Sequence, residues 1–294
     1  EISWYLNLPK SIKYISPRVF DYSLDKKNPS IQLEFYGYPV LNDLYLYGNL
    51  DLGTWAIIFN AIEMTLEDFR KFLPSENEVV KFKKSMIDMY EKKTFTRMDM
   101  YMDLSQFNWA KNNNLNINGT PCLSINEIYE SISTTLDKSK IYSNPEYSIV
   151  HGDFCFSNIL FDRKNTSIRL IDPRGSFGEF DIYGDPNYDL CKLSHSIEGD
   201  YDFFINGLFN FHINDNKISL NPFISNRQKN IKRLYREKII AQKGELVINQ
   251  IRLLESLLFL SMIPLHNDRP LSQNALLARG MLLYSETRKY FIEK

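Results

Sequence analysis

The chain has 294 residues, of which 44% are hydrophobic and 24% are charged, so its composition is that of a globular protein and excludes a disordered or fibrous one. A chain of this length usually forms about two domains or lobes and buries a core that needs no disulfide or structural metal. Its 35 basic and 36 acidic residues leave a formal charge of −1, which gives no basic field to attract nucleic acid or anionic lipid. We therefore expect a small ligand, no nucleic-acid partner and no membrane partner.

The cysteines and the apolar stretches indicate a cytoplasmic protein. Three widely spaced cysteines, without a CxxC pair, are typical of free thiols in a reducing compartment: Cys122, Cys155 and Cys191. The most apolar stretch, Leu253 to Leu265, has 13 residues, fewer than the roughly 20 that span a bilayer. No signal peptide opens the chain, which begins at Glu1 rather than Met, so we expect it to be a segment of a longer protein.

The first forty residues are predicted to hold the end of a helix and two short strands. Glu1 to Leu8 has the pattern of the last turns of a helix, because prolines interrupt the chain soon after it. Val19 to Tyr22 and Ile31 to Tyr36 are rich in β-branched and aromatic residues, and turn-forming residues separate them. The chain changes character at Gly37, which we take as the start of a boundary.

Helices dominate the prediction for the remaining chain. Apolar residues recur at helical spacing from Leu52 to Phe72, and a second helix is expected from about Glu76 to Met102. Ser124 and Glu127 form a capping box that opens a third helix. The other expected elements are an Asn-rich connector at 112–118, a strand pair at about Phe209 to Leu220, and long helices at about Ser225 to Ile263 and Ser272 to Tyr290.

One segment, Ile149 to Arg174, carries the candidate catalytic residues. It contains the tripeptide H-G-D with His151 and Asp153, then Asn158 five residues after the aspartate and Asp172 fourteen residues after that. Two carboxylates and a carboxamide, without a cysteine ligand, favour a hard cation such as Mg²⁺ or Mn²⁺. The segment therefore predicts a metal held partly by a substrate's phosphates.

The chain between Asn158 and Asp172 is predicted to be a β-hairpin. Ile159 to Phe161 and Ile168 to Ile171 are short apolar strands, and turn-forming residues lie between them. Because a hairpin brings its ends together, we expect the side chains of Asn158 and Asp172 to converge with that of Asp153.

Such a set of groups suits phosphoryl transfer, in which a metal bridges phosphate oxygens and an aspartate orients the attacking hydroxyl. The kinase catalytic loop H-R-D-x-x-x-x-N has the same five-residue step from aspartate to asparagine. Here Gly152 replaces the arginine and the chain has no A-P-E motif, which argues against a protein kinase.

The motif H-G-D-x-x-x-x-N, followed by apolar residues and I-D-P-R, resembles the aminoglycoside phosphotransferase and choline kinase family of small-molecule kinases. Y-D-L at residues 188–190 is similar to that family's element after the metal aspartate. I-D-P-R-G and Y-G-D at 183–185 further resemble kinase-like proteins of bacterial capsule and surface-polysaccharide gene clusters, some fused to nucleotidyltransferases. The resemblance implies an α+β, protein-kinase-like fold with two lobes. Residues 1–40 would be the remainder of the nucleotide-binding lobe with its hinge, and residues 41–294 the helical lobe.

The resemblance also implies roles for single residues. Asp153 would be the catalytic base, and His151 would brace its loop. Asn158 and Asp172 would be the metal ligands and would contact the nucleotide through the metal. Asp189 would hold the loop from behind by hydrogen bonds. The implied cofactors are Mg²⁺ or Mn²⁺, with ATP or GTP as co-substrate.

The hinge and the substrate contacts are also inferred. The backbone of Glu34, Phe35 and Tyr36 would meet the edge of the adenine ring, according to the resemblance. Two interpretations stay open for Arg174 and Asp185, namely substrate contacts and local ion pairs. For His266, at the end of the apolar helix, the alternatives are a place in the substrate cleft and a structural role.

The resemblance is incomplete at the front of the nucleotide lobe. Kinases of this fold have a Gly-rich loop over the phosphates and a lysine on a strand. Here the first glycine is Gly37 and no G-x-G-x-x-G occurs. Either these parts precede Glu1 in a longer protein, or the protein binds nucleotide weakly.

The expected function is a kinase that transfers the γ-phosphoryl group of ATP or GTP to a hydroxyl of a sugar, polyol or amino alcohol. Surface-polysaccharide precursor synthesis is the expected setting, with a nucleotidyltransferase fused to the chain or working with it. The alternative is a catalytically impaired pseudokinase that serves as a binding or regulatory module.

Overall fold

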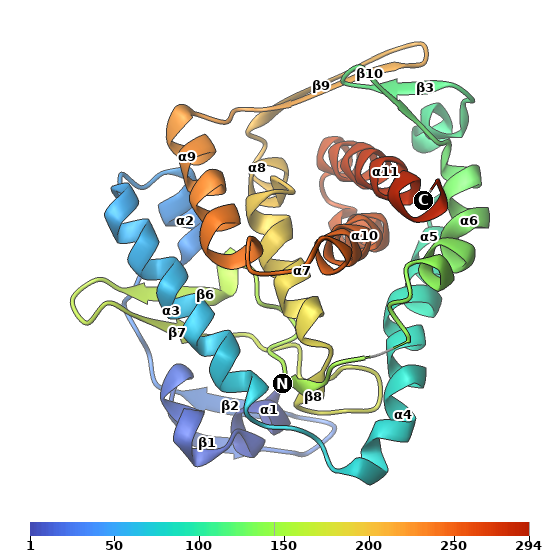
Figure 1. The fold of residues 1–294 in the computed structure, drawn as a ribbon. Helices are drawn as coiled ribbons and strands as arrows, with labels where there is room; N and C mark the ends of the chain where they lie inside the picture. The colour runs from blue at the N-terminus through green and yellow to red at the C-terminus, as the bar shows by residue number, and fades with distance from the viewer. Residues whose placement is uncertain (144, 294) are drawn as a thin grey trace. The chain divides into compact units, whose positions relative to one another are not determined.

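The structure is a computed structural model that describes residues 1–143 and 145–293, and its fold is α+β, as predicted (Figure 1). The chain forms two compact units, each built from three separate stretches of sequence. Unit 1 comprises residues 1–85, 146–196 and 226–242, and unit 2 comprises residues 86–145, 197–225 and 243–294. The expected lobe boundary near residue 40 falls within unit 1 and stays a prediction.

Unit 1 begins with a short helix and a hairpin. Helix α1 (Ile2–Asn7) is followed by the 3-10 helix η1 (Lys10–Ile15), and strands β1 (Val19–Ser23) and β2 (Ser30–Leu33) pair antiparallel. The predicted helix end and both strands are confirmed, although β2 ends at Leu33, before the residues assigned to the hinge.

Further helices of unit 1 are α2 (Leu41–Leu46), α3 (Leu52–Arg70), the first part of α4 (Glu76–Ile87), α7 (Pro186–Ile197) and α9 (Asn226–Tyr235). Helix α9 continues into the π-helix η5 (Arg236–Ile240). Helix α3 confirms the predicted amphipathic helix. Its N-cap residue Asp51 accepts a hydrogen bond from the backbone N–H of Thr54 at 2.9 Å, and its apolar face, including Trp55 and Phe59, is buried.

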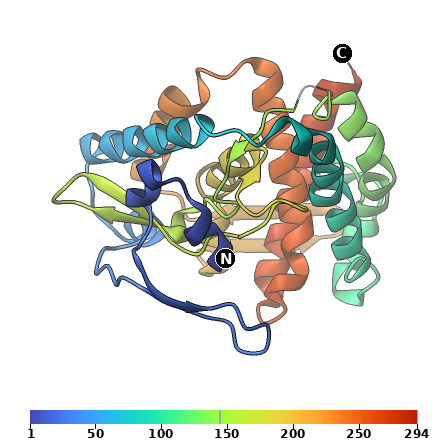
Figure 2. The same ribbon diagram turned by 90° about the horizontal axis from the view of Figure 1, so that it is seen from below.

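Two small ladders frame the segment that carries the candidate catalytic residues. Strands β5 (Ser148–Ile149) and β8 (Tyr183–Gly184) pair antiparallel at its two ends. Between them, β6 (Ile159–Asp162) and β7 (Ser167–Leu170) form the predicted hairpin, in the register Ile159 opposite Leu170. The 3-10 helix η1 lies against strand β7 of this hairpin (Figure 2).

Unit 2 is built around two long helices, α10 (Glu245–Met262) and α11 (Pro270–Ile292), which lie side by side (Figures 1 and 2). Helix α6 (Ile125–Lys138) opens with the predicted capping box, because Ser124 and Glu127 exchange side-chain and backbone hydrogen bonds. The remaining helices of this unit are η2 (Asp88–Lys92), α5 (Lys93–Asp99), η3 (Ser105–Lys111), α8 (Tyr201–Ile205) and η6 (Ile263–His266).

A four-stranded sheet completes unit 2. Its order is β4 (Thr120–Cys122), β3 (Leu115–Ile117), β10 (Lys217–Pro222), β9 (Phe209–Asn214). The predicted strand pair is confirmed by β9 and β10. The prediction of a connector at 112–118 is wrong in part, because the buried side chains of Leu115 and Ile117 make β3 a strand beside β10.

The long helix predicted from Ser225 to Ile263 is wrong, because it is two helices. The first ends at Ile240, and α10 begins after Gly244, whose ψ of 156° is extended rather than helical. The helix predicted from Glu76 to Met102 is a continuous helical run, α4 to α5, which ends at Asp99 and has one π-helical turn.

Helix α10 is the apolar helix of the sequence analysis, longer than the 13-residue stretch suggested. By length and composition Glu245–His266 could cross a membrane, but 72% of its most apolar window is buried inside the protein, as in a core helix. The three cysteines are buried, and no disulfide joins them. The cytoplasmic location stays a prediction.

Candidate active site

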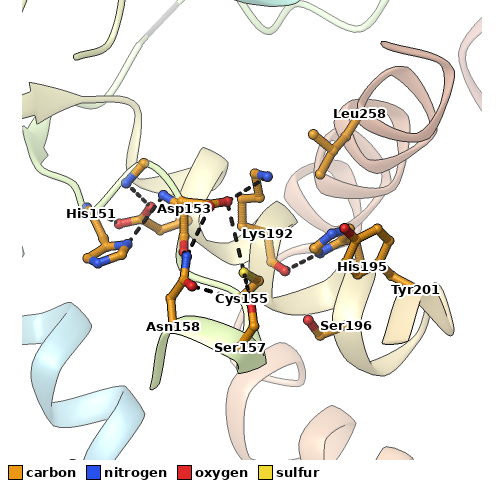
Figure 3. A network of polar contacts seen from close by, with 12 residues as sticks. His151, Asp153, Cys155, Ser157, Asn158, Lys192, His195, Ser196, Tyr201 and Leu258 are labelled. Carbon is orange, nitrogen blue, oxygen red and sulfur yellow. Dashed lines mark hydrogen bonds and ion pairs between the residues drawn. The ribbon is translucent and has the colours of Figure 1, made fainter. Parts of the chain in front are cut away.

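The loop between β5 and β6 brings two of the predicted site residues into contact (Figure 3). The side-chain amide Nδ2 of Asn158 donates hydrogen bonds to the backbone carbonyl of Asp153 and to its carboxylate Oδ2, both at 2.9 Å. The 3-10 helix η4 (Phe156–Asn158) turns the chain back between the two residues. The five-residue spacing therefore closes a ring in which the asparagine fixes the aspartate.

Asp189 holds this loop through its backbone. Its two carboxylate oxygens accept hydrogen bonds from the N–H groups of His151 at 2.7 Å and Gly152 at 2.8 Å. Burial raises the pKa of Asp189 to about 7, and the two N–H donors oppose this rise. Its place behind the loop is the one that the resemblance implies.

Two further side chains of α7 reach the same loop. The ammonium Nζ of Lys192 lies 2.7 Å from Oδ1 of Asp153, and the hydroxyl of Ser196 accepts the backbone N–H of Phe156 at 3.1 Å. With Asp189 they occupy positions i, i+3 and i+7, which lie on one face of a helix. One helix face thus carries three residues that bind the loop.

Lys192 also sets the charge state of Asp153. Burial favours the neutral carboxyl, but the neighbouring ammonium outweighs burial and lowers the pKa of Asp153 to about 2. In turn, the carboxylate of Asp153 raises the pKa of Lys192 above its ordinary value, although burial acts against the charged form. Both groups are therefore charged at neutral pH.

His151 is buried and neutral. Its Nδ1 accepts the backbone N–H of Asp153 at 3.3 Å, and its ring packs edge-on against Trp4 and Phe154 at centroid distances of 5.3 and 6.0 Å. Burial lowers the pKa of His151 to about 4. A neutral imidazole among aromatic rings suits a brace for the loop better than a carrier of protons.

Gly152 explains why the position after His151 is not arginine. Its φ is +77°, a conformation that side chains disfavour, and a Cβ built there would lie 2.8 Å from the Cβ of Arg174. The backbone N–H of Arg174 donates to the carbonyl of His151 at 3.0 Å. The loop and the segment after β7 therefore pack closely at this glycine.

Asp172 lies next to the loop by its backbone. The N–H of the preceding residue, Ile171, donates to the carbonyl of Asn158 at 3.0 Å, and the N–H of Asp172 donates to the hydroxyl of Tyr5 at 3.2 Å. Its side chain is exposed, and the described residues provide no hydrogen bond or ion pair to its carboxylate. Of the three predicted side chains, two are in contact and the third is anchored beside them without touching them.

The donor groups suit a magnesium ion that is shared with phosphates. Asn158 uses its Nδ2 to hold Asp153, which leaves the amide oxygen Oδ1, 3.3 Å from the Ser157 hydroxyl, as a possible ligand. Asp172 adds an exposed carboxylate. No group of three or more His, Cys, Asp or Glu side chains that could hold a metal occurs in the described part of the chain. Mg²⁺ usually binds to few protein oxygens, and water and phosphate oxygens complete its coordination shell.

The residues assigned to the hinge follow β2 in irregular structure. The carboxylate of Glu34 accepts the Tyr36 hydroxyl at 2.9 Å, and the side chain of Phe35 is 90% exposed. The ring of Tyr36 stacks on Tyr38 at 5.3 Å, with the guanidinium of Arg169 on it at 5.6 Å. Glu34, Tyr36 and Arg169 line an open pocket of about 580 Å³.

The three expected substrate residues have different surroundings. Arg174 is exposed in unit 1. Asp185 is buried, and its carboxylate accepts the backbone N–H of Asn187 at 2.9 Å, a local contact at the start of α7. His266 belongs to unit 2, where its Nε2 lies 3.4 Å from the Tyr201 hydroxyl. Their substrate roles stay predictions.

Sequence reasoning missed Lys192, Ser196 and Tyr5. The first two share the helical spacing of Asp189, so treating residues 186–197 as a helix would have placed them on the loop's side. Tyr5 gives no such signal, because its contact with Asp172 joins residues 167 positions apart.

No protein-family model matches this chain, and no curated protein matches it. Among solved structures, an ethanolamine kinase from Plasmodium vivax is similar, with a TM-score of 0.48 and 14% sequence identity. The alignment covers 99% of this chain and 72% of that chain. The narrower resemblance to kinase-like proteins of polysaccharide gene clusters stays a prediction.

Proposed function

We propose that this protein is a phosphotransferase that moves the γ-phosphoryl group of ATP or GTP to a hydroxyl of a small polar molecule. The observation that carries the proposal is the setting of Asp153. One of its carboxylate oxygens is held by the Asn158 amide and the other by the Lys192 ammonium, on a loop suspended from Asp189. A fixed, half-exposed carboxylate beside two candidate metal ligands suits the orientation of an attacking hydroxyl.

In this proposal each residue has a distinct task. Asp153 accepts a hydrogen bond from the acceptor hydroxyl and takes its proton as the new O–P bond forms. The bond between the γ-phosphorus and the bridging oxygen breaks, and the nucleoside diphosphate leaves with that electron pair. Mg²⁺, when bound by Asn158 and Asp172, supplies neutralisation of the phosphate charge. The low pKa of Asp153 suits this chemistry, because the hydroxyl loses its proton late.

The acceptor we propose is a sugar, polyol or amino alcohol, with surface-polysaccharide precursor synthesis as the setting and a nucleotidyltransferase as working partner. The hinge proposal places the adenine against residues 34–36. A screen of sugars, polyols and amino alcohols for phosphate acceptance, with ATP and GTP in parallel, identifies the acceptor and the preferred nucleotide.

The decisive variant is Asp172→Ala. It is expected to lower transfer by at least about a hundredfold, because it removes one of two protein ligands of the metal, and the side chain it truncates is exposed. The measurement is phosphate transfer to the best acceptor over a range of Mg²⁺ concentrations. Asp103→Ala is the matched control, because that carboxylate is 91% exposed in unit 2, and its activity should equal the wild type.

Two results would count against the proposal. Transfer that survives Asp172→Ala unchanged would remove the metal assignment. A wild type that binds Mg²⁺ and ATP in calorimetry, yet phosphorylates none of the acceptors, would instead support a binding or regulatory module.

A further inference from the structure

The catalytic loop contains no cation of its own. From His151 to Asn158 the sequence is H-G-D-F-C-F-S-N, without lysine or arginine. Phosphoryl transfer nevertheless develops negative charge next to the oriented hydroxyl, and fixed positive groups stabilise it. A cation near Asp153 has to come from another part of the chain.

Lys192 of α7 is that cation. Its side chain is 12% exposed, and its Nζ lies 2.7 Å from Oδ1 of Asp153. Oδ2 of the same carboxylate accepts from the Asn158 amide at 2.9 Å. The thiol Sγ of Cys155 lies 3.9 Å from the same Oδ1, a longer and weaker contact than that of the ammonium. With partners on both oxygens, the plane and the direction of the carboxylate are both restrained (Figure 3).

The contact differs from the two others that α7 makes with the loop. Asp189 and Ser196 bind backbone N–H groups, so they hold the path of the chain. Lys192 binds a side chain. The loop therefore keeps its backbone supports when the lysine is removed, whereas the carboxylate of Asp153 loses its ammonium partner.

Stability does not explain a buried ammonium at this place. Taking two charges out of water costs free energy that their mutual attraction often only balances, and a pair of apolar side chains of similar volume in the same place is frequently as stable. Methionine matches the stem of lysine and contains no charge. We therefore attribute the buried ammonium of Lys192 to the geometry of the reaction rather than to stability.

We infer that Lys192 is a positioning residue for the transfer step, which fixes the Asp153 carboxylate from helix α7 in the orientation that receives the acceptor hydroxyl. The inference rests on the proposed function. It assigns to the helix, rather than to the loop, the control of the group that contacts the substrate.

The kinetic test compares Lys192→Met, Lys192→Arg and Asp153→Asn with the double variant. Lys192→Met is expected to lower kcat about a hundredfold and to leave the KM of acceptor and nucleotide within about threefold. Lys192→Arg should recover about tenfold of the loss, because it keeps the charge. If the lysine acts through Asp153, the double variant is no slower than Asp153→Asn alone.

The matched control is Lys71→Met. Lys71 forms an ion pair of similar length with Asp68, at 2.6 Å, on the exposed end of α3, and its loss should leave kcat and KM unchanged. Unchanged kcat in Lys192→Met would overturn the inference. A double variant slower than Asp153→Asn by tenfold or more would also overturn it, because the lysine would then act on the substrate itself.

A crystal structure of Lys192→Met separates this inference from the proposed function. The Asp153 side chain should leave its position, while the N–H groups of residues 151 and 152 stay on Asp189. An Asp153 that keeps its rotamer overturns the inference, whatever the activity. A wild type without transfer, together with a displaced Asp153 in the variant, overturns the proposed function and leaves the positioning contact established.

Discussion

His151 and Asp189 are both buried and titratable, and both accept hydrogen bonds from the backbone of the same loop. The pKa of His151 is lowered to about 4 by burial, so between pH 6.5 and 4 the unfolded chain takes up a proton that the folded chain refuses. Acidification therefore costs stability through His151. The pKa of Asp189 is raised to about 7 by burial, so between about pH 4 and 7 the folded chain keeps a proton that the unfolded chain releases. A rise in pH therefore costs stability through Asp189.

The two residues should cancel each other in the wild type between pH 4.5 and 6.5. In Asp189→Asn only the histidine effect remains, and the free energy of unfolding should rise with pH by up to about 1.4 kcal/mol per pH unit. His151→Gln should show the opposite slope. Urea denaturation at pH 4.5, 5.5 and 6.5 measures all three. An Asp189→Asn profile that runs parallel to the wild type would show that Asp189 is ionised throughout the range.

At the scale of single residues, the sequence predicts contacts between residues that are near in the chain or that belong to one motif. The contact of Asp153 with Asn158 follows from a five-residue turn. The helical spacing of Lys192 from Asp189 could have placed it on the side of the loop, but a lysine in the middle of a helix usually lies in solvent and only tertiary packing buries this one. The direction of the Asp172 carboxylate was out of reach, since no packing partner in the described chain fixes an exposed side chain.

Helix α6 illustrates how much a short signal determines at the scale of an element. The side chain of Ser124 accepts the backbone N–H of Glu127 at 3.3 Å, and the Glu127 carboxylate accepts the N–H of Ser124 at 2.7 Å. These bonds satisfy donors that the first turn of a helix leaves without a partner.

Ser124→Ala should lower the free energy of unfolding by about 1 kcal/mol, the usual cost of a lost N-cap. Thr134→Ala, at an exposed position of the same helix, is the control and should be neutral or slightly stabilising, because alanine is the better helix former. Urea denaturation compares the two variants. Equal stability of Ser124→Ala and the wild type would mean that the cap contributes nothing.

The mispredicted elements depend on distant partners or on a single residue. Strand β3 exists because Asn116 and Ile117 pair with Lys217 and Ile218, about a hundred residues later. The break between η5 and α10 rests on Gly244, a single glycine among good helix formers, and periodicity alone does not detect it. Caps and hairpins are local and were predicted correctly.

The whole molecule consists of two units whose sequences interleave. Each unit needs contributions from three stretches, so that contacts within a unit join residues far apart. In unit 1 the guanidinium of Arg227 donates to the carbonyl of Tyr45 at 2.7 Å, and in unit 2 the hydroxyl of Tyr101 donates to the carbonyl of Leu260 at 2.9 Å.

A fragment of residues 1–145 should therefore not fold, although it is longer than many independent domains. It lacks α7 and α9 of unit 1 and α10 and α11 of unit 2. Limited proteolysis should degrade it quickly, and urea should give no cooperative transition. A sharp unfolding transition of this fragment would contradict the division into units. Interleaving of this kind has no signature in composition, so the sequence analysis did not predict it.

The β5–β8 ladder has a consequence for how such a protein diversifies. Ser148 pairs with Gly184 and Ile149 with Tyr183, so the β5–β8 ladder joins the two ends of the stretch between them and closes it into a loop. Lengthening a chain outside a closed loop adds little to the entropy of closing it. Insertions before Ser148 or after α7 can therefore change the surroundings of the reaction, and with them the choice of acceptor molecule. The arrangement of the residues inside the closed loop stays the same.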